Sequence, residues 1–260
     1  MDNNPARISR RAAMRVWITR TAPLLLLAAI GKPAEAALNR AASPSPAALP
    51  LAQAGPGQAA APTCVLTPQQ TEGPYFVDER LNRSDIRSDP SDGTVKDGVP
   101  LRLVLQVSQV TGGACSPLVG ARVDLWQCDA LGVYSDVRDP GFISSGAKFL
   151  RGYQVTDDNG SVQFTTIYPG WYQGRTVHIH FKVRTTPDSE SGHELTSQFY
   201  FDDALTDQVH AQQPYVQKGQ RTLRNPQDGI FRNGGSQLLL PLTQEGQGYA
   251  ATFQLGLQMG

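Results

Sequence analysis

Two of the chain's four histidines stand one residue apart, in the segment TVHIHFKV that begins at Thr176. Apolar residues occupy every second position of this segment, which predicts a half-buried β-strand. His178 and His180 then lie on the same strand face, with Cα atoms about 7 Å apart, so that both imidazole rings can reach one metal ion. The pattern also fits an ordinary strand with one solvent-exposed face and no metal. The types of the neighbouring residues distinguish the two interpretations.

Tyrosines near the histidine pair indicate which metal such a site would hold. Tyr168 and Tyr172 lie just upstream of the pair, and Tyr134 closes the turn in WQCDALGVY. If the histidines were the only ligands, zinc or copper would be the natural choice. Phenolate is a hard anionic oxygen donor, and ferric iron, more than zinc, carries the charge needed to ionise tyrosine near neutral pH. The combination therefore favours ferric iron.

The elements that must position these side chains are short segments rich in Val, Leu, Phe and Thr, separated by turn signals such as DDNG at Asp157. There is no sustained helical period and no internal repeat. We therefore expect an all-β domain, an antiparallel β-sandwich of short strands with long loops. The expected strands are 101–110, 121–128, 161–167, 176–183, 197–201, 236–242 and 249–257.

The first 36 residues are typical of an export signal. A basic stretch with the pair Arg10-Arg11 precedes the apolar run APLLLLAAI and an A-x-A pattern that ends at Ala36. We expect 1–36 to be a signal peptide of the twin-arginine type, 37–62 a disordered Ala/Pro-rich linker, and 63–260 the folded domain. The mature protein would be periplasmic or extracellular, without a stable membrane anchor. The alternative is a disordered basic tail on a cytoplasmic protein.

Charge and cysteine usage narrow the choice of partners. Lys plus Arg and Asp plus Glu both number 23, so the overall charge attracts neither nucleic acid nor an anionic membrane. A small-molecule ligand fits this balance. Three cysteines, Cys64, Cys115 and Cys128, allow at most one intramolecular disulfide in an exported chain, with the pairing left open, and their spacing does not match a zinc site.

From Thr71 onward the sequence resembles the intradiol ring-cleavage dioxygenases, which split catechols between their two hydroxyl groups using non-haem ferric iron. The segments TEGPYF, VDLWQCDALGVYS, TDDNGSVQFTTIYPGWY, RTVHIHF and SQFYF carry the resemblance and follow the family's order. Carried over by position, the resemblance implies Fe(3+) as the cofactor and four metal ligands, which are Tyr134, Tyr172, His178 and His180. Tyr168 lies four residues too early for the PGxY pattern and is not expected to be a ligand.

The resemblance also implies catalytic roles for Arg175 and Gln198, which would steady the negative charge that develops on the substrate and orient intermediates. The implied reaction converts a catechol and O2 to a muconate-type diacid without an external reductant. Where family members commonly have Arg-Pro-Ala, this chain has Arg175-Thr176-Val177, and the spacing from Tyr172 to His178 is short. We therefore expect a trimmed loop beside the substrate.

A single protocatechuate 3,4-dioxygenase subunit is the better analogy within the family, because the helical N-terminal domain with which catechol and hydroxyquinol cleavers dimerise is not found. Oligomer formation stays possible, and the sequence leaves open which catechol is cleaved. Two rival interpretations come from other classes of protein. One is a binding-only, transthyretin-like β-sandwich, which has no need of four convergent ligands, and the other is a secreted copper- or zinc-binding protein, which leaves the tyrosines unexplained.

Overall fold

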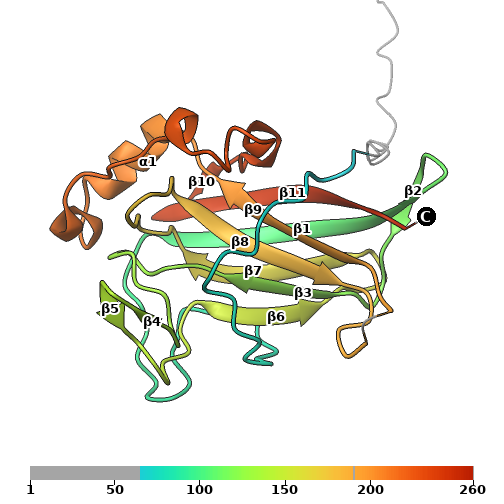
Figure 1. The fold of residues 1–260 in the computed structure, drawn as a ribbon, viewed down its shortest axis with the longest axis horizontal. Helices are drawn as coiled ribbons and strands as arrows, with labels where there is room; N and C mark the ends of the chain where they lie inside the picture. Colours follow the sequence, from blue (N-terminus) through green and yellow to red (C-terminus); the bar gives the residue numbers. More distant parts are fainter. Residues whose placement is uncertain (1–64, 190, 260) are drawn as a thin grey trace, which may run out of the picture. The chain divides into compact units, whose positions relative to one another are not determined.

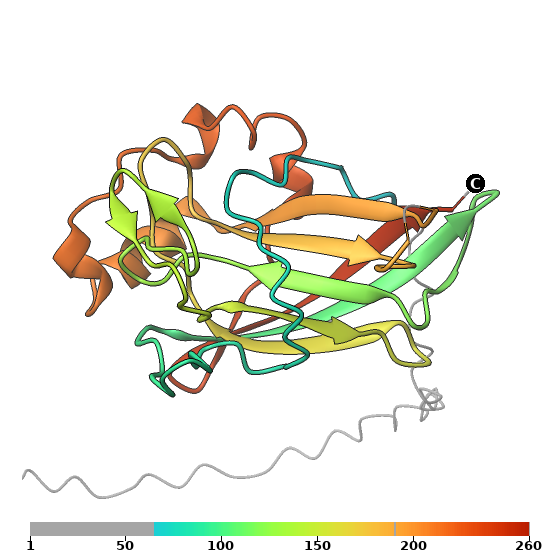
Figure 2. The ribbon, with the colours of Figure 1, turned by 60° about the horizontal axis from the view of Figure 1, so that its bottom comes forward.

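A computed structural model describes residues 65–189 and 191–259, which belong to the compact unit Gly57–Gly260. Most of the regular structure over these residues is β-structure, and its main part is arranged as two stacked sheets (Figure 1, Figure 2). The all-β class predicted from the sequence is therefore confirmed for this part of the chain. The predicted signal peptide 1–36 and linker 37–62 lie outside the described residues.

The first sheet has the order β10-β11-β1-β2, and β7 also pairs with β1. Along β1, buried and partly exposed residues alternate, as the period of two predicts for a strand with one face on the core. The pair β1 and β11 is parallel, so the prediction of a purely antiparallel sandwich is wrong here. Most of the domain separates these two strands, so no hairpin turn forces them to be antiparallel. The strands are β1 (Pro100–Thr111), β2 (Ala114–Pro117), β7 (Ser161–Ile167), β10 (Thr243–Glu245) and β11 (Gly248–Gln258).

The second sheet has the order β6-β3-β8-β9, and all its pairs are antiparallel. Ile179, Phe181 and Val183 of β8 are fully buried in the core between the sheets. His178 and His180 therefore face the other side of the sheet, because side chains alternate along a strand. The segment before β1 crosses this outer face (Figure 1, Figure 2) and bonds to β9. The strands are β3 (Arg122–Trp126), β6 (Arg151–Val155), β8 (His178–Arg184) and β9 (Glu194–Tyr200).

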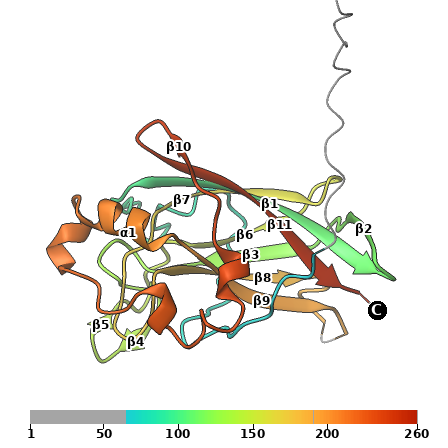
Figure 3. The same ribbon diagram turned by 90° about the horizontal axis from the view of Figure 1, so that it is seen from above.

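Short helices and a hairpin gather at one end of the sheets, the end at which β8 begins (Figure 1, Figure 3). Asp202 caps the only α-helix in the described part of the chain, because its side chain accepts from the backbone N–H of Leu205 at 2.9 Å. The elements are α1 (Asp203–His210), the 3-10 helices η1 (Tyr215–Lys218), η2 (Asn225–Gln227) and η3 (Gly235–Leu238), and the hairpin of β4 (Arg138–Asp139) and β5 (Phe142–Ile143).

The predicted strand 236–242 is wrong. This segment forms η3 and then a single bridge between Leu239 and Tyr200. A short apolar run does not distinguish a strand from a buried helical turn, and Pro241 lacks the N–H that a strand ladder needs. Leu238 and Leu240 are nevertheless buried, so the apolar run serves the core by another route.

The cysteines that the structure describes differ in state. Cys115 is disulfide-bonded, whereas Cys128 is a free and buried thiol. The disulfide, whose pairing the sequence left open, therefore does not involve Cys128, and the remaining cysteine, Cys64, lies outside the described residues. None of the helices in the described ranges is long and apolar enough to cross a membrane.

Candidate metal centre

Four side chains predicted to be metal ligands converge on the outer face of the second sheet. His178 Nε2 lies 3.0 Å from His180 Nε2. The hydroxyl oxygens of Tyr134 and Tyr172 each lie 3.4 Å from the same nitrogen of His178. The structure thus brings together all four residues, although Tyr134 is far from the histidines in sequence.

The two tyrosines come from loops that are fixed by hydrogen bonds in one case and by close packing in the other. The buried Arg151 donates from Nη2 to the backbone oxygen of Ser135 at 2.7 Å and from Nε to its hydroxyl at 2.9 Å, which holds the loop around Tyr134. In the loop before Tyr172, Gly170 approaches the neighbouring loop so closely that a Cβ would lie 2.4 Å from the backbone oxygen of Ala130. This position therefore requires glycine.

Both imidazole rings are held in one orientation. His178 Nδ1 lies 2.7 Å from the backbone oxygen of Thr176, so this nitrogen carries the proton and Nε2 keeps a free lone pair. The ring of His180 stacks on Trp126, with centroids 4.9 Å apart and planes 6° apart. Gly73 covers its edge, and a Cβ there would lie 3.3 Å from His180 Cε1. The fixed rings direct their Nε2 atoms toward each other.

Burial sets the charge of the four groups. Burial, together with the positive charge of Arg175, lowers the pKa of His178 to about 3. Burial and the neighbouring His178 lower the pKa of His180 well below its usual value. Both rings are therefore neutral at pH 7, which is the form that binds metals. Burial raises the pKa of Tyr134 well above its usual value and that of Tyr172 to about 12, so an additional positive charge is needed to ionise either phenol.

The distances between these atoms fit one bound cation. Two ligands that each lie about 2.1 Å from an ion, the distance known for zinc and imidazole, are about 3.0 Å apart at a right angle and about 3.4 Å apart at the tetrahedral angle. The separations of 3.0 and 3.4 Å from His178 Nε2 match these two cases. Within the described ranges no group of three or more His, Cys, Asp or Glu side chains is placed to hold a metal. The two tyrosines supply the oxygen atoms that approach the paired imidazoles.

The two predicted catalytic residues, Arg175 and Gln198, lie together beside the histidines. Arg175 Nη2 donates to Gln198 Oε1 at 2.6 Å, and Arg175 Nη1 lies 3.5 Å from His178 Nε2. Gln198 is fully buried on β9 and stands opposite His180 in the ladder between β8 and β9. A cationic donor and a fixed amide thus border the convergence point.

Tyr168 and the two other histidines do not join the four convergent side chains. The hydroxyl groups of Tyr168 and Thr206 form a hydrogen bond of 2.7 Å in the core. His210 Nε2 bonds to the backbone oxygen of Pro169 at 3.0 Å, and His193 is exposed between β8 and β9. The choice of Tyr172 over Tyr168 agrees with this geometry.

Sequence reasoning missed residues that surround the four side chains. Tyr75 stacks on Tyr134, with ring centroids 4.6 Å apart, and donates its hydroxyl to Asp139 Oδ2 at 2.7 Å. Trp126 and Asp228 are two further neighbours of the site that the sequence did not predict. Tyr75 and Trp126 lie within the motifs TEGPYF and VDLWQC, and this position could have indicated their place beside the site. Asp228 lies far from every motif, and no pattern in the sequence pointed to it.

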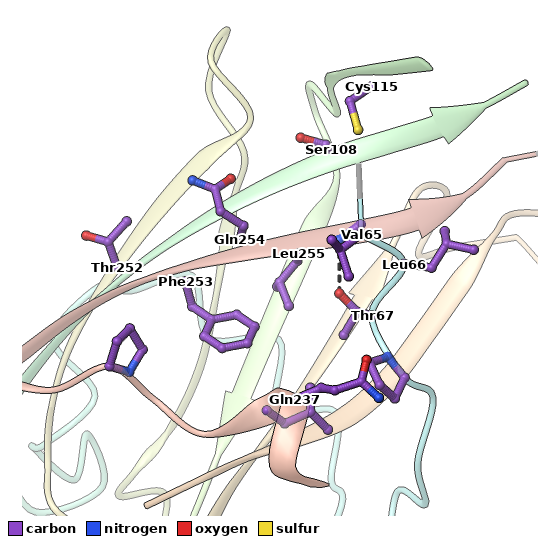
Figure 4. A pocket seen from close by; sticks show the side chains of 14 residues that line it. Val65, Leu66, Thr67, Ser108, Cys115, Gln237, Thr252, Phe253, Gln254 and Leu255 are labelled. Atoms are coloured by element: carbon purple, nitrogen blue, oxygen red, sulfur yellow. Dashed lines mark hydrogen bonds between the residues drawn. The ribbon is translucent and has the colours of Figure 1, made fainter. Parts of the chain in front are cut away.

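A cavity of about 320 Å³ lies elsewhere, between the start of the described chain, η3 and β11 (Figure 4). Its walls are mostly apolar and include Leu66, Phe253 and Leu255. The backbone N–H of Gly256 donates to Thr67 Oγ1 at 2.9 Å and ties two of the walls together. None of the predicted site residues lines this cavity, so it is separate from the metal centre.

Comparisons with known proteins agree with this arrangement. A family model described as "Dioxygenase" matches residues 71–230. The solved structure of an intradiol ring-cleavage dioxygenase from Tetranychus urticae is 31% identical, with a TM-score of 0.65, over 75% of this chain and 95% of its own. The dioxygenase domain of a carbohydrate-binding fusion protein from Streptomyces sp. SirexAA-E is 28% identical, with a TM-score of 0.52, over 75% of this chain and all of its own. Catechol 1,2-dioxygenase 1 of Acinetobacter lwoffii is 30% identical over 156 residues.

The chain belongs to the intradiol ring-cleavage dioxygenase family. The matched segment covers 51% of this chain and 45% of the Acinetobacter lwoffii protein. For chlorocatechol 1,2-dioxygenase of Pseudomonas putida, the covered share is 52% of that protein. The chain thus spans about half the length of these two curated relatives.

Proposed function

We propose that this chain is a non-haem ferric dioxygenase that cleaves the aromatic ring of a catechol between its two hydroxyl groups, with O2, to give a muconate-type diacid. The observation that carries the proposal is the convergence of two neutral imidazoles and two phenols at separations of 3.0 to 3.4 Å. Family membership supports the same reaction class. Two similar proteins, from Candida albicans and Acinetobacter lwoffii, are named catechol 1,2-dioxygenases, which supports a catechol as the substrate.

His178, His180, Tyr134 and Tyr172 would hold the iron. When bound, ferric iron supplies a Lewis acid and an electron acceptor for the aromatic ring. Tyr134 is fully buried, whereas Tyr172 is partly exposed. We infer that the oxygen of Tyr172, the less buried of the two phenols, takes up a proton from a catechol hydroxyl. Tyr134, which is fully enclosed, would stay among the residues that hold the iron.

Arg175 is placed to stabilise the negative charge of the bound catechol. Its Nη1 faces the convergence point, 3.5 Å from His178 Nε2. Because the side chain is only 14% exposed, its charge acts in a poorly hydrated environment, in which a fixed donor stabilises an anion more strongly than in water. Gln198 holds Arg175 in this direction through the hydrogen bond at its Oε1.

A visible absorption spectrum of the purified protein tests the proposal, with metal analysis of the same sample and a second spectrum after catechol is added without oxygen. We expect iron, a tyrosinate-to-iron absorption band, and a shift of that band with catechol. The His178→Ala variant should lose both iron and turnover, and His193→Ala, which changes an exposed loop histidine, should keep them. A protein that stays colourless after loading with ferric salt would instead favour a binding-only or copper/zinc role.

We further propose that the mature protein acts in the periplasm or outside the cell. The disulfide at Cys115 supports this location, because structural disulfides persist in oxidising compartments. The expected signal peptide 1–36 would direct the export. Replacing Arg10 and Arg11 with lysine should keep the protein inside the cell, and cell fractionation measures the outcome. Unchanged export of that variant would contradict the twin-arginine route.

A further inference from the structure

Asp228 is a buried carboxylate with four hydrogen bonds beside the candidate metal centre. It follows η2, and its side chain is only 1% exposed. Its Oδ2 accepts from Arg175 Nε and from the backbone N–H of Thr176, both at 2.8 Å. Its Oδ1 accepts from the backbone N–H groups of Ile230 at 2.7 Å and Phe231 at 3.1 Å. The carboxylate is therefore fixed in position from both sides.

The guanidinium group of Arg175 is held at two of its three nitrogens. Nε donates to Asp228 and Nη2 donates to Gln198, which leaves Nη1 facing His178 Nε2. Because a guanidinium is planar, two fixed nitrogens determine the direction of the third. Asp228 and Gln198 together thus set where the remaining donor points.

Gln198 is itself restrained. Its Nε2 donates to the backbone oxygen of Thr71 at 2.8 Å, and its Oε1 accepts from the hydroxyl of Tyr200 at 3.1 Å. Gln198 is neutral, so Asp228 is the group that compensates the charge of Arg175 through a direct ion pair. A buried cation without such a partner would be costly.

We propose that Asp228 is a positioning residue for the reaction, which keeps Arg175 Nη1 directed at the site where the catechol oxygens bind. This inference rests on the proposed function. A donor that is already oriented stabilises developing charge without a reorganisation cost, so its loss lowers the rate of the chemical step more than it weakens substrate binding. Asp228 itself does not touch the substrate.

A double-mutant cycle of Asp228→Asn and Arg175→Gln tests the proposal. We expect Asp228→Asn to lower kcat by about 10- to 100-fold while iron content and KM change little. In the Arg175→Gln background, the same substitution should cause no further loss of kcat, because the group that it positions is absent. Single-turnover measurements keep slow variants within range. If the two effects multiply in the double variant, the proposal is wrong.

Further variants separate positioning from folding. Asp228 also binds three backbone N–H groups, so Asp228→Asn should lower Tm whether residue 175 is Arg or Gln. A loss of kcat that occurs only when Arg175 is present is specific to the positioning role. Asp228→Glu retains the charge and should recover part of kcat. Asp207→Asn is the matched control, because Asp207 pairs with Arg221 and Arg224 away from the metal centre and its loss should change Tm without changing kcat. A comparable loss of kcat in this control would overturn the proposal.

An NMR measurement on the metal-free protein makes this inference independent of turnover. The Nε–H signal of Arg175 should exchange slowly with water in the unmodified protein and rapidly in Asp228→Asn. If no catechol is cleaved but this signal is protected as expected, the proposed function fails and the ion pair stands. Rapid exchange in the unmodified protein would contradict the positioning role itself.

Discussion

Acid should destabilise the metal-free protein through His178 and His180. Burial keeps both rings neutral in the folded state, with a pKa of about 3 for His178 and one well below the usual value for His180. In the unfolded chain a histidine has a pKa of about 6.5. Below that pH the unfolded chain binds protons at these histidines and the folded protein does not, so the free energy of unfolding falls as the pH falls.

The size of the effect follows from the two pKa values. Between pH 7.5 and pH 5.0, the unfolded form of His178 gains about 2 kcal/mol relative to the folded form. His180 and the buried His210, whose pKa values burial also lowers, add losses of the same sign. The loss begins near pH 6.5 and, for His178, continues down to its folded pKa of about 3. Carboxylates whose pKa is lowered in the folded protein add about 0.1 kcal/mol each or less at pH 5.0, and this part cancels when a histidine variant is compared with the unmodified protein. Such a loss is a large part of the stability of a typical domain.

Urea unfolding of the metal-free protein at the two pH values measures this loss. The His178→Asn variant should show a pH-dependent loss smaller by about 2 kcal/mol, because only one buried histidine remains on β8. If His178→Asn keeps the full pH dependence, then His178 is not held neutral by burial and the argument for a preformed metal site is wrong.

Three further predictions concern the same region. Gly73→Ala should destabilise the protein by about 1–3 kcal/mol and weaken metal binding, because the backbone there has φ of 72° and the new Cβ would press on His180. Urea unfolding measures the stability and metal titration measures the affinity. Unchanged metal affinity would contradict the packing argument. Tyr168→Phe should cost about 1 kcal/mol through the lost bond to Thr206 and leave the visible spectrum unchanged, whereas a bleached variant would make Tyr168 a ligand. Removing the metal with a ferric chelator should abolish colour and turnover, and recovery with zinc in place of ferric salt would exclude the proposed iron chemistry.

The sequence predicted the parts of the site that depend on local patterns. Alternation along TVHIHFKV placed His178 and His180 on one face, and the structure confirms this orientation. The strand 161–167 was also predicted with the observed limits, because turn residues bound it on one side and a proline follows on the other. These features need only a strand period and turn chemistry.

The parts that the sequence did not predict depend on contacts between distant residues. The parallel pairing of β1 with β11 follows from how the whole chain is routed, which no local pattern records. Asp228 reaches Arg175 across a separation of 53 residues, and a lone Asp-Gly dipeptide indicates only a turn. The segment 236–242 was mistaken for a strand because apolar content alone does not determine backbone shape.

The parallel pair of β1 and β11 also bears on when this domain can fold. The first long strand of the described chain needs the last one as its partner along nearly its whole length. Until β11 has been synthesised, one edge of β1 presents unpaired N–H and C=O groups. Contacts so distant in sequence also form slowly. Folding of this domain is therefore completed only once β11 itself is available to pair with β1.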